Sequence, residues 1–378
     1  ADGEYRFISH NFFGGADTFR AYGCNMVDDA FEIDENGVVS PILIPTIADL
    51  IGYDPDTDGA PPPDTDKPFL IEEHRNYLFL AFPGGRVVHS VIGQPLNFSG
   101  FLDAAEFGLG DEVTGLNSVV GGVLVMTTER ETQGLFGSTS LDWEKRLIGE
   151  RTGGKLYSAQ KLDTVYAIDD LGITSVARTE TFGDFVGATV SQLIQPIINS
   201  LRDNVNWATI VRKLNQVRWY FDDNTCLIMY VPAAGSVNES RGTQTALRVQ
   251  FGLCSYPLQI KRIYNTDDET EAERTFFAST DGYVYEDLVG FNFDGAAIQS
   301  YVRTSFTHMG TPALRKYFRR LDVELSSGRP LSLRVGFDLT YGAPEISSGI
   351  TDSTIMNIPT VDVFSGGGFW DNDSWNCL

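Results

Sequence analysis

Three carboxylates at alternate positions are the best candidate for metal chemistry in this sequence. Asp54, Asp56 and Asp58 precede a glycine, which is the spacing that opens an EF-hand loop, where alternating oxygens wrap Ca²⁺. The twelfth position of such a loop should be Glu, but Thr65 stands there, and the three prolines at 61–63 would stiffen the loop. We therefore favour a flexible acidic surface loop, with a structural Ca²⁺ clip at the three aspartates as the alternative.

The other residues capable of chemistry form no known catalytic pattern. The sequence has no nucleophile elbow, P-loop, H-E-x-x-H or dinucleotide glycine motif. The histidines His10, His74, His89 and His308 lie far apart, so a histidine-built metal site would need long-range convergence. Carboxylates are too abundant for counting to decide on a glycosidase pair. The run 279–282 (STDG) weakly resembles the Asp-box turn of sialidases but is better explained as a hairpin turn. We predict no catalytic residue and no cofactor.

The cysteines do not indicate a metal site or an oxidising compartment. Cys24, Cys226, Cys254 and Cys377 include no C-x-x-C pair and have no neighbouring histidine. Cys226 and Cys254 lie in apolar, strand-like runs, where a reduced and buried thiol is the expected state.

Composition and net charge limit the classes of protein to which the chain can belong. Of the 378 residues, 42% are hydrophobic and 12% aromatic, which is typical of a packed globular chain. No apolar run approaches the roughly 20 residues that span a bilayer, and no signal-peptide layout is visible, so we predict no membrane insertion. The net charge of −23 disfavours tight nucleic-acid binding, because an acidic surface repels phosphate. The acidity either serves solubility or forms a wall past which DNA slides without sticking; both interpretations stay open.

A recurring unit of two apolar runs around a tight turn indicates a series of β-hairpins. Asn-Gly, Gly-Gly, Asp-Asn and Asp-Gly pairs supply the positive-φ positions that tight turns need. The hairpins recur about every 40–57 residues, which is blade spacing for a propeller. They are expected near residues 30–39, 77–91, 123–136, 165–177, 219–231 and 275–285.

The fold class that we predict is all-β, a β-propeller of five to seven blades. A plain β-sandwich is the alternative, since it also has strands at short regular spacing. Residues 188–203 carry apolar side chains at helical spacing and predict one inserted amphipathic helix that plugs or braces the propeller.

The residues after the last hairpin predict a different region. We assign 1–296 to the propeller core, 297–345 to an added platform sheet of long strands, and 346–378 to a C-terminal extension that docks on a neighbour or is incomplete. The platform is the most basic stretch of an acidic chain. Its candidate interface residues are therefore Arg303, Lys316, Arg319 and Arg320, which would meet acidic neighbours unless they only form a solvated strand face.

Several phrases resemble the tail nozzle proteins of short-tailed bacteriophages, also called tail hub or tail tubular protein B. They are NYLFLAF at 76–82 leading into VHS and GQPLNF, DEVTGL at 111–116, the 165–177 hairpin followed by FGDF, and RTSFTHMG at 303–310 followed by VGFD. The similarity spans about residues 18–345 and is a pattern of hairpins and short phrases.

This resemblance implies a structural virion protein and no enzyme. It implies a homo-hexameric ring that docks on a tail adaptor ring, holds tail fibres or spikes, and passes DNA during ejection without specific binding. The location would be the virion tail, assembled in the host cytoplasm. Loops 54–67 or 232–245 are candidates for a gate in the channel.

Two other functions stay open at this stage. One is a glycan-binding or glycan-cleaving propeller at the virion surface, which should have an axial pocket with paired carboxylates and aromatic platforms. The other is a monomeric protein-interaction propeller.

Overall fold

The structure is a computed structural model that divides into two compact units, Ala1–Gly295 and Ala296–Leu378. It describes residues 3–15, 18–44, 67–119, 122–150, 152–178, 185–232, 249–268, 270, 272–290, 292–300, 331–333 and 361–363.

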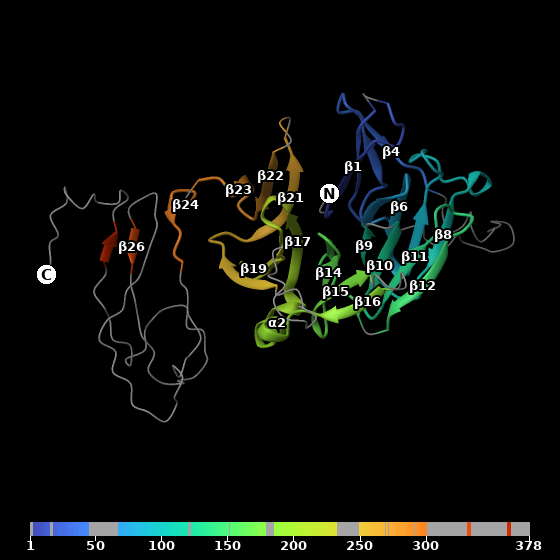
Figure 1. The fold of residues 1–378 in the computed structure, drawn as a ribbon. Helices are drawn as coiled ribbons and strands as arrows, with labels where there is room; N and C mark the ends of the chain where they lie inside the picture. Colours follow the sequence, from blue (N-terminus) through green and yellow to red (C-terminus); the bar gives the residue numbers. More distant parts are fainter. Residues whose placement is uncertain are drawn as a thin grey trace, which may run out of the picture. The chain divides into compact units, whose positions relative to one another are not determined.

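The first unit contains six antiparallel sheets that follow one another along the chain (Figure 1). Five sheets have four strands and the sixth has three, and in every sheet the strands lie side by side in chain order. The first strand of each sheet contacts the first strand of the next, from β1 through β5, β9, β13 and β17 to β21. The unit is therefore a six-bladed β-propeller with the first strand of each blade innermost. This confirms the predicted fold class.

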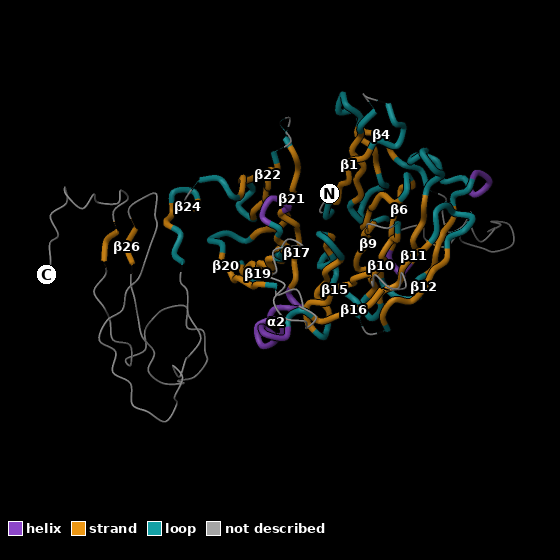
Figure 2. Tube along the Cα trace, in the orientation of Figure 1, coloured by secondary structure: helices purple, strands orange, loops and turns teal. Residues whose placement is uncertain are grey.

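Loops and tight turns join the strands (Figure 2). The first three blades contain β1 (Arg6–His10), β2 (Arg20–Cys24), β3 (Phe31–Ile33) and β4 (Val39–Pro41); β5 (Leu70–His74), β6 (Tyr77–Phe82), β7 (Arg86–His89) and β8 (Ala105–Gly108); and β9 (Val113–Val119), β10 (Val123–Thr128), β11 (Thr132–Phe136) and β12 (Glu144–Gly149). The last three contain β13 (Gln160–Lys161), β14 (Val165–Asp169), β15 (Gly172–Arg178) and β16 (Phe185–Thr189); β17 (Val205–Val211), β18 (Gln216–Phe221), β19 (Thr225–Tyr230) and β20 (Gln250–Ser255); and β21 (Ile260–Asp267), β22 (Glu273–Ser279) and β23 (Val284–Asp287). Short 3-10 turns cover Pro83–Gly85, Gly100–Leu102, Gln192–Ile194, Arg202–Asn204 and Arg212–Leu214.

Five of the predicted hairpins coincide with the second and third strands of blades 2 to 6, whereas the run 30–39 covers β3 and the turn into β4. These middle strands read as continuous apolar runs because neighbouring blades cover both of their faces. In the second blade all six residues of β6 are buried. An outermost strand such as β12 has its first four residues exposed.

One α-helix is present among the described residues, as predicted, but it is shorter than the run 188–203. α2 spans Gln195–Leu201, because residues up to Thr189 belong to β16, which pairs with β15. Pro196 lies in the first turn of α2, where its missing N–H costs no hydrogen bond. Ile198 and Leu201 pack with residues of β14, β15, β18 and β19, so the helix braces the fourth and fifth blades.

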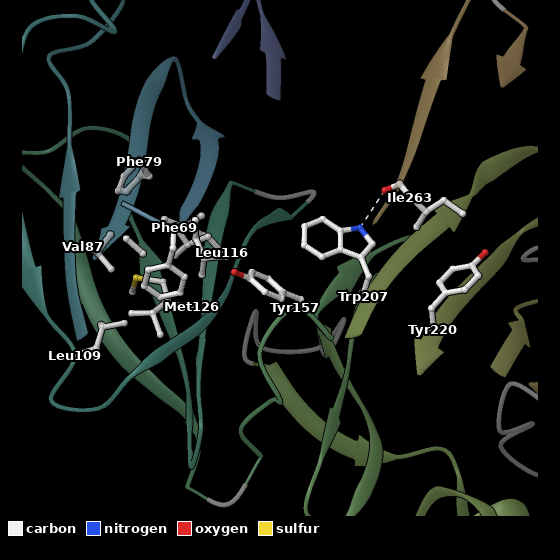
Figure 3. Close-up of a cluster of buried hydrophobic side chains, with 14 of the residues drawn as sticks. Phe69, Phe79, Val87, Leu109, Leu116, Met126, Tyr157, Trp207, Tyr220 and Ile263 are labelled. Atoms are coloured by element: carbon white, nitrogen blue, oxygen red, sulfur yellow. Dashed lines mark hydrogen bonds between the residues drawn. The ribbon is translucent and has the colours of Figure 1, made fainter. Parts of the chain in front are cut away.

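Side-chain hydrogen bonds join the inner strands of the fifth and sixth blades. The indole Nε1 of Trp207 on β17 donates to the carbonyl oxygen of Ile263 on β21 at 3.0 Å (Figure 3). Asn206 donates to the carbonyl oxygen of Ile260 at 2.7 Å, and Asn265 donates back to that of Ile210 at 2.6 Å.

Beyond the sixth blade the described strands are short. β24 (Asn292–Phe293) and β25 (Ala296–Ala297) are followed by β26 (Leu331–Leu333) and β27 (Val361–Val363). β26 and β27 pair in antiparallel register, Leu331 opposite Val363. The predicted platform at 297–345 otherwise lies almost wholly outside the described residues, as do nearly all of the runs 54–67 and 232–245.

Candidate functional site

A cavity of about 750 Å³ lies among the inner strands of the propeller. Its walls include residues of β1, β5, β9, β13, β17 and β21, the first strand of every blade. The same cavity is lined by residues of the first and last blades, so it also extends between these two blades. They are Tyr5, Phe7, Phe276 and Val284. Its volume is in the range of sites that bind small molecules, roughly 300–1,000 Å³.

Two guanidinium groups and the Trp207 ring form the polar centre of the cavity wall, and the Tyr157 ring packs against Arg6 and Trp207. The guanidinium carbon of Arg6 lies 4.7 Å from the ring centroid of Tyr157 and 4.8 Å from that of Trp207. That of Arg262 lies 4.6 Å from the Trp207 ring. The two rings themselves are 4.8 Å apart, and they lie beside each other in Figure 3. Cations at this distance are attracted by the negative faces of the rings.

Arg6 is half-buried at the cavity wall. Burial lowers its pKa, because desolvation disfavours the charged form. Its Nε has no hydrogen-bond partner among the described residues. The structure records no ion pair for Arg6 in the part of the chain that it describes, although Glu72 is close enough to favour its charged form.

Glu72 is a cavity-lining carboxylate whose charge changes near neutral pH. Burial raises its pKa to about 7, against the opposing effects of Lys161 and Arg6. One carboxylate oxygen accepts a hydrogen bond from the backbone N–H of Ser118, 3.3 Å away. Near neutral pH this carboxyl group is therefore partly protonated, and the negative charge of the cavity is correspondingly smaller.

The second guanidinium is paired. Arg262 forms an ion pair with Glu4 and donates to the side-chain oxygen of Asn206 at 3.0 Å. This ion pair joins the segment before β1 to β21 of the last blade. Burial and the nearby Glu4 together raise the pKa of Tyr157 to about 12, so its hydroxyl stays protonated.

Exposed aromatic rings lie at the open part of the cavity. Tyr5, Phe7 and Tyr264 are 43%, 38% and 46% exposed, and all three line it. The rings of Tyr5 and Phe7 are nearly parallel with centroids 6.0 Å apart. The cavity thus combines cationic and amide groups with apolar ring faces, as binding sites for small polar ligands do.

The site residues expected from the sequence lie outside the part of the chain that the structure describes. Asp54, Asp56 and Asp58, the Ca²⁺ candidates, and Arg303, Lys316, Arg319 and Arg320, the interface candidates, lie outside the described residues. Within the described ranges no group of three or more His, Cys, Asp or Glu side chains could hold a metal ion. No helix in those ranges is both long and apolar enough to cross a membrane.

Two of the histidines lie in an aromatic cluster instead. His74 and His89 are buried, with ring centroids 6.5 Å and 4.8 Å from that of Trp143. Burial lowers the pKa of both imidazoles, that of His74 to about 4. Both are packing groups of the second blade, in contact with Trp143, which precedes β12 of the third blade.

The sequence analysis did not single out the cavity residues Arg6, Glu72, Trp207 and Arg262. The hairpins drew attention to the middle strands, whereas the cavity is lined by the strand before each hairpin. A usable signal existed in these weaker runs. Arg6 stands between Tyr5 and Phe7, and a charged residue inside a short aromatic strand needs a polar surface to face.

Comparisons with known proteins give no family for the chain. No protein-family model matches it, and no curated protein sequence matches significantly. Solved structures with similarity include BBS1N in complex with ARL6DN, at 13% identity over 75% of this chain and 79% of that one, with a TM-score of 0.46. The β-propeller domain of Cps50 (Swd1) from Myceliophteria thermophila has 10% identity over 77% and 84% of the two chains, with a TM-score of 0.46. Virginiamycin B lyase from Staphylococcus aureus has 10% identity over 75% and 88%, with a TM-score of 0.41.

Proposed function

We propose that this chain is a structural subunit of the tail of a short-tailed bacteriophage. Six copies would form a nozzle or hub ring that docks on the adaptor ring, passes DNA during ejection and holds fibres or spikes. The chain would be part of the virion and would not be an enzyme.

The observation that supports this proposal most is the architecture. A six-bladed propeller ends at Gly295 and is followed by a second compact unit. A propeller with an added platform is what the resemblance to tail nozzle proteins implies. The net charge of −23 adds to it, since a wall of like charge lets DNA pass without trapping it.

Native mass spectrometry of the purified chain tests the proposal. We expect a species of six copies, alone or after addition of an adaptor ring from a short-tailed phage. A chain that stays monomeric under both conditions and hydrolyses a surface polysaccharide would overturn it. Cryo-electron microscopy of the assembled ring would then show whether loops 54–67 and 232–245 reach the channel, as a gate requires.

The cavity favours a second candidate function, a glycan-binding or glycan-cleaving propeller. Glu4 and Glu72 both line the cavity, together with exposed aromatic rings. Incubation with bacterial surface polysaccharide, followed by measurement of reducing ends, distinguishes cleavage from binding alone. A Glu72→Gln variant should abolish any cleavage in which this carboxyl group acts as the acid.

A further inference from the structure

The cavity wall contains several hydrogen-bond donors without a partner in the described part of the chain. They are Nε of Arg6, Nε of Arg262 and the side-chain nitrogen of Asn117, and all three residues line the cavity. Asn117 is only 8% exposed, so solvent at the surface does not satisfy its amide. Buried donors are nearly always paired in folded proteins, so these three atoms show that the wall is short of acceptors. They have almost no accessible surface of their own, so a ligand in the cavity would bind the terminal nitrogens of the guanidinium groups.

The unpaired atoms are all donors, and two of the three belong to guanidinium groups, which favours an anionic ligand. No acceptor oxygen of a cavity-lining side chain is among the buried atoms without a partner in the described residues. Arg6, Lys261 and Arg262 stand against Glu4 and Glu72, and the Glu72 carboxyl group is partly protonated near neutral pH. A chain of net charge −23 thus places a small cationic excess at its cavity. A carboxylate would complement it, because a guanidinium binds a carboxylate through charge-assisted hydrogen bonds.

The remaining residues of the cavity wall indicate what kind of molecule carries the carboxylate. Tyr5, Phe7 and Tyr264 expose ring faces to the cavity, whereas Asn117, Gln160 and Thr209 offer amide and hydroxyl groups. Ring faces that pack on C–H surfaces, alternating with groups that bind hydroxyls, suit a pyranose ring. The volume of about 750 Å³ accommodates one or two sugar residues.

We propose that the cavity binds a carboxylated sugar, such as a uronic acid residue of an acidic polysaccharide, with its carboxylate on Arg6. The sugar ring packs on Tyr264 and its hydroxyls bind Gln160. This site does not depend on the ring assembly proposed above. It binds the sugar and does not cleave it.

Titration of the full-length protein with sodium glucuronate, followed by saturation-transfer NMR and calorimetry, tests the site. We expect a dissociation constant of about 1 mM, as for a single small ligand. Glucose, which has the same ring without the carboxylate, should bind at least about tenfold more weakly, since a charge-assisted hydrogen bond is lost. Equal binding of glucose, or of sodium acetate, would overturn the proposal, because the first removes the role of the carboxylate and the second that of the sugar.

Substitutions at Arg6 and Tyr264, with one at Arg146 as the control, test where the ligand binds. Arg6→Gln should weaken glucuronate binding about tenfold or more, whereas Arg146→Gln, an exposed arginine on the outer strand β12, should leave it unchanged. Arg6 is half-buried and packs on Trp207, so its variant is first checked for folding by circular dichroism. Tyr264→Ala changes an exposed ring and should weaken binding several-fold in a folded protein. Unchanged affinity in Tyr264→Ala, or an equal loss in Arg146→Gln, would contradict the assignment whatever the oligomeric state of the chain.

Discussion

At the residue scale, two adjacent glycines in the β6–β7 turn differ in how much space they leave for a side chain. Gly84 and Gly85 have φ values of 78° and 83°, a conformation that L-residues adopt at a cost. A Cβ at Gly84 would meet nothing within 4 Å, whereas one at Gly85 would lie 2.4 Å from the carbonyl oxygen of Asp111. Only Gly85 therefore has a steric reason to be glycine as well as a conformational one.

We expect Gly84→Ala to cost about 1 kcal/mol of unfolding free energy, the usual penalty of a left-handed alanine. Gly85→Ala should cost about 3 kcal/mol, because the backbone at Asp111 must also move. Urea unfolding of the two variants measures the difference. Equal losses in the two variants would show that the turn, and not the contact with Asp111, sets the requirement.

His74 gives a second prediction at this scale, concerning acid stability. Its pKa is lowered from 6.5 to about 4 in the folded chain, chiefly by burial. Below pH 6.5 the unfolded chain therefore binds more protons than the folded one, so stability falls as the pH falls. The loss continues until about pH 4, at up to about 1.4 kcal/mol per pH unit.

A His74→Gln variant should show a shallower fall in stability than the wild type between pH 6.5 and 4. Thermal unfolding across this range compares the two slopes, with values at pH 8 as the reference for any direct effect of the substitution. Parallel curves for the two proteins would mean that the His74 imidazole does not stay neutral in the fold.

At the scale of elements, a buried ion pair joins the fifth and sixth blades. Nη1 of Arg218 on β18 lies 2.8 Å from Oδ2 of Asp287 on β23, and the two side chains are 5% and 11% exposed. Gln216 also accepts two hydrogen bonds from Arg218. Removal of Asp287 would leave a buried guanidinium without its counter-charge.

We predict that Asp287→Asn destabilises the protein by about 3 kcal/mol, as measured by urea unfolding. The control is Glu286→Gln on the same strand, whose partner Arg274 is exposed; this change should have little effect. The Arg218→Met, Asp287→Asn double variant should recover part of the loss, since no charge stays buried. A double variant that is less stable than the single one would show that the pair stabilises the blades beyond charge compensation.

The elements also show how far a sequence can predict this fold. Middle strands such as β6 were predictable because burial on both faces makes them continuously apolar. β1 was not, because its residues alternate between half-buried and exposed, and Arg6 faces a cavity that exists only after the blades assemble. The start of α2 was placed too early, because Ala188 and Thr189 pair with β15 as the end of β16 and Gln192–Ile194 form a 3-10 turn before the helix.

At the scale of the whole propeller, closure of the circle rests on side chains. The first blade is built from residues between Arg6 and Pro41 and the sixth from residues between Ile260 and Asp287, so in the described part of the chain no strand is shared between them. The ion pair between Glu4 and Arg262 connects the two ends across the cavity, and the contact of Arg6 with Trp207 joins the first blade to the fifth. A circle closed in this way should open locally before it unfolds globally.

We predict that Glu4→Gln increases amide hydrogen exchange in β1 and β21, whereas exchange in β10 and β14 stays unchanged, because only the closing contact is weakened. Mass spectrometry of peptic peptides provides the measurement. Glu144→Gln is the matched control, since Glu144 is a similarly exposed carboxylate whose partner Arg146 lies on the same strand. If both variants exchange like the wild type in β1 and β21, packing of the inner strands alone holds the first and last blades together. If Glu4→Gln raises exchange in every blade, the circle opens and unfolds as one cooperative unit, and local opening at the cavity does not occur.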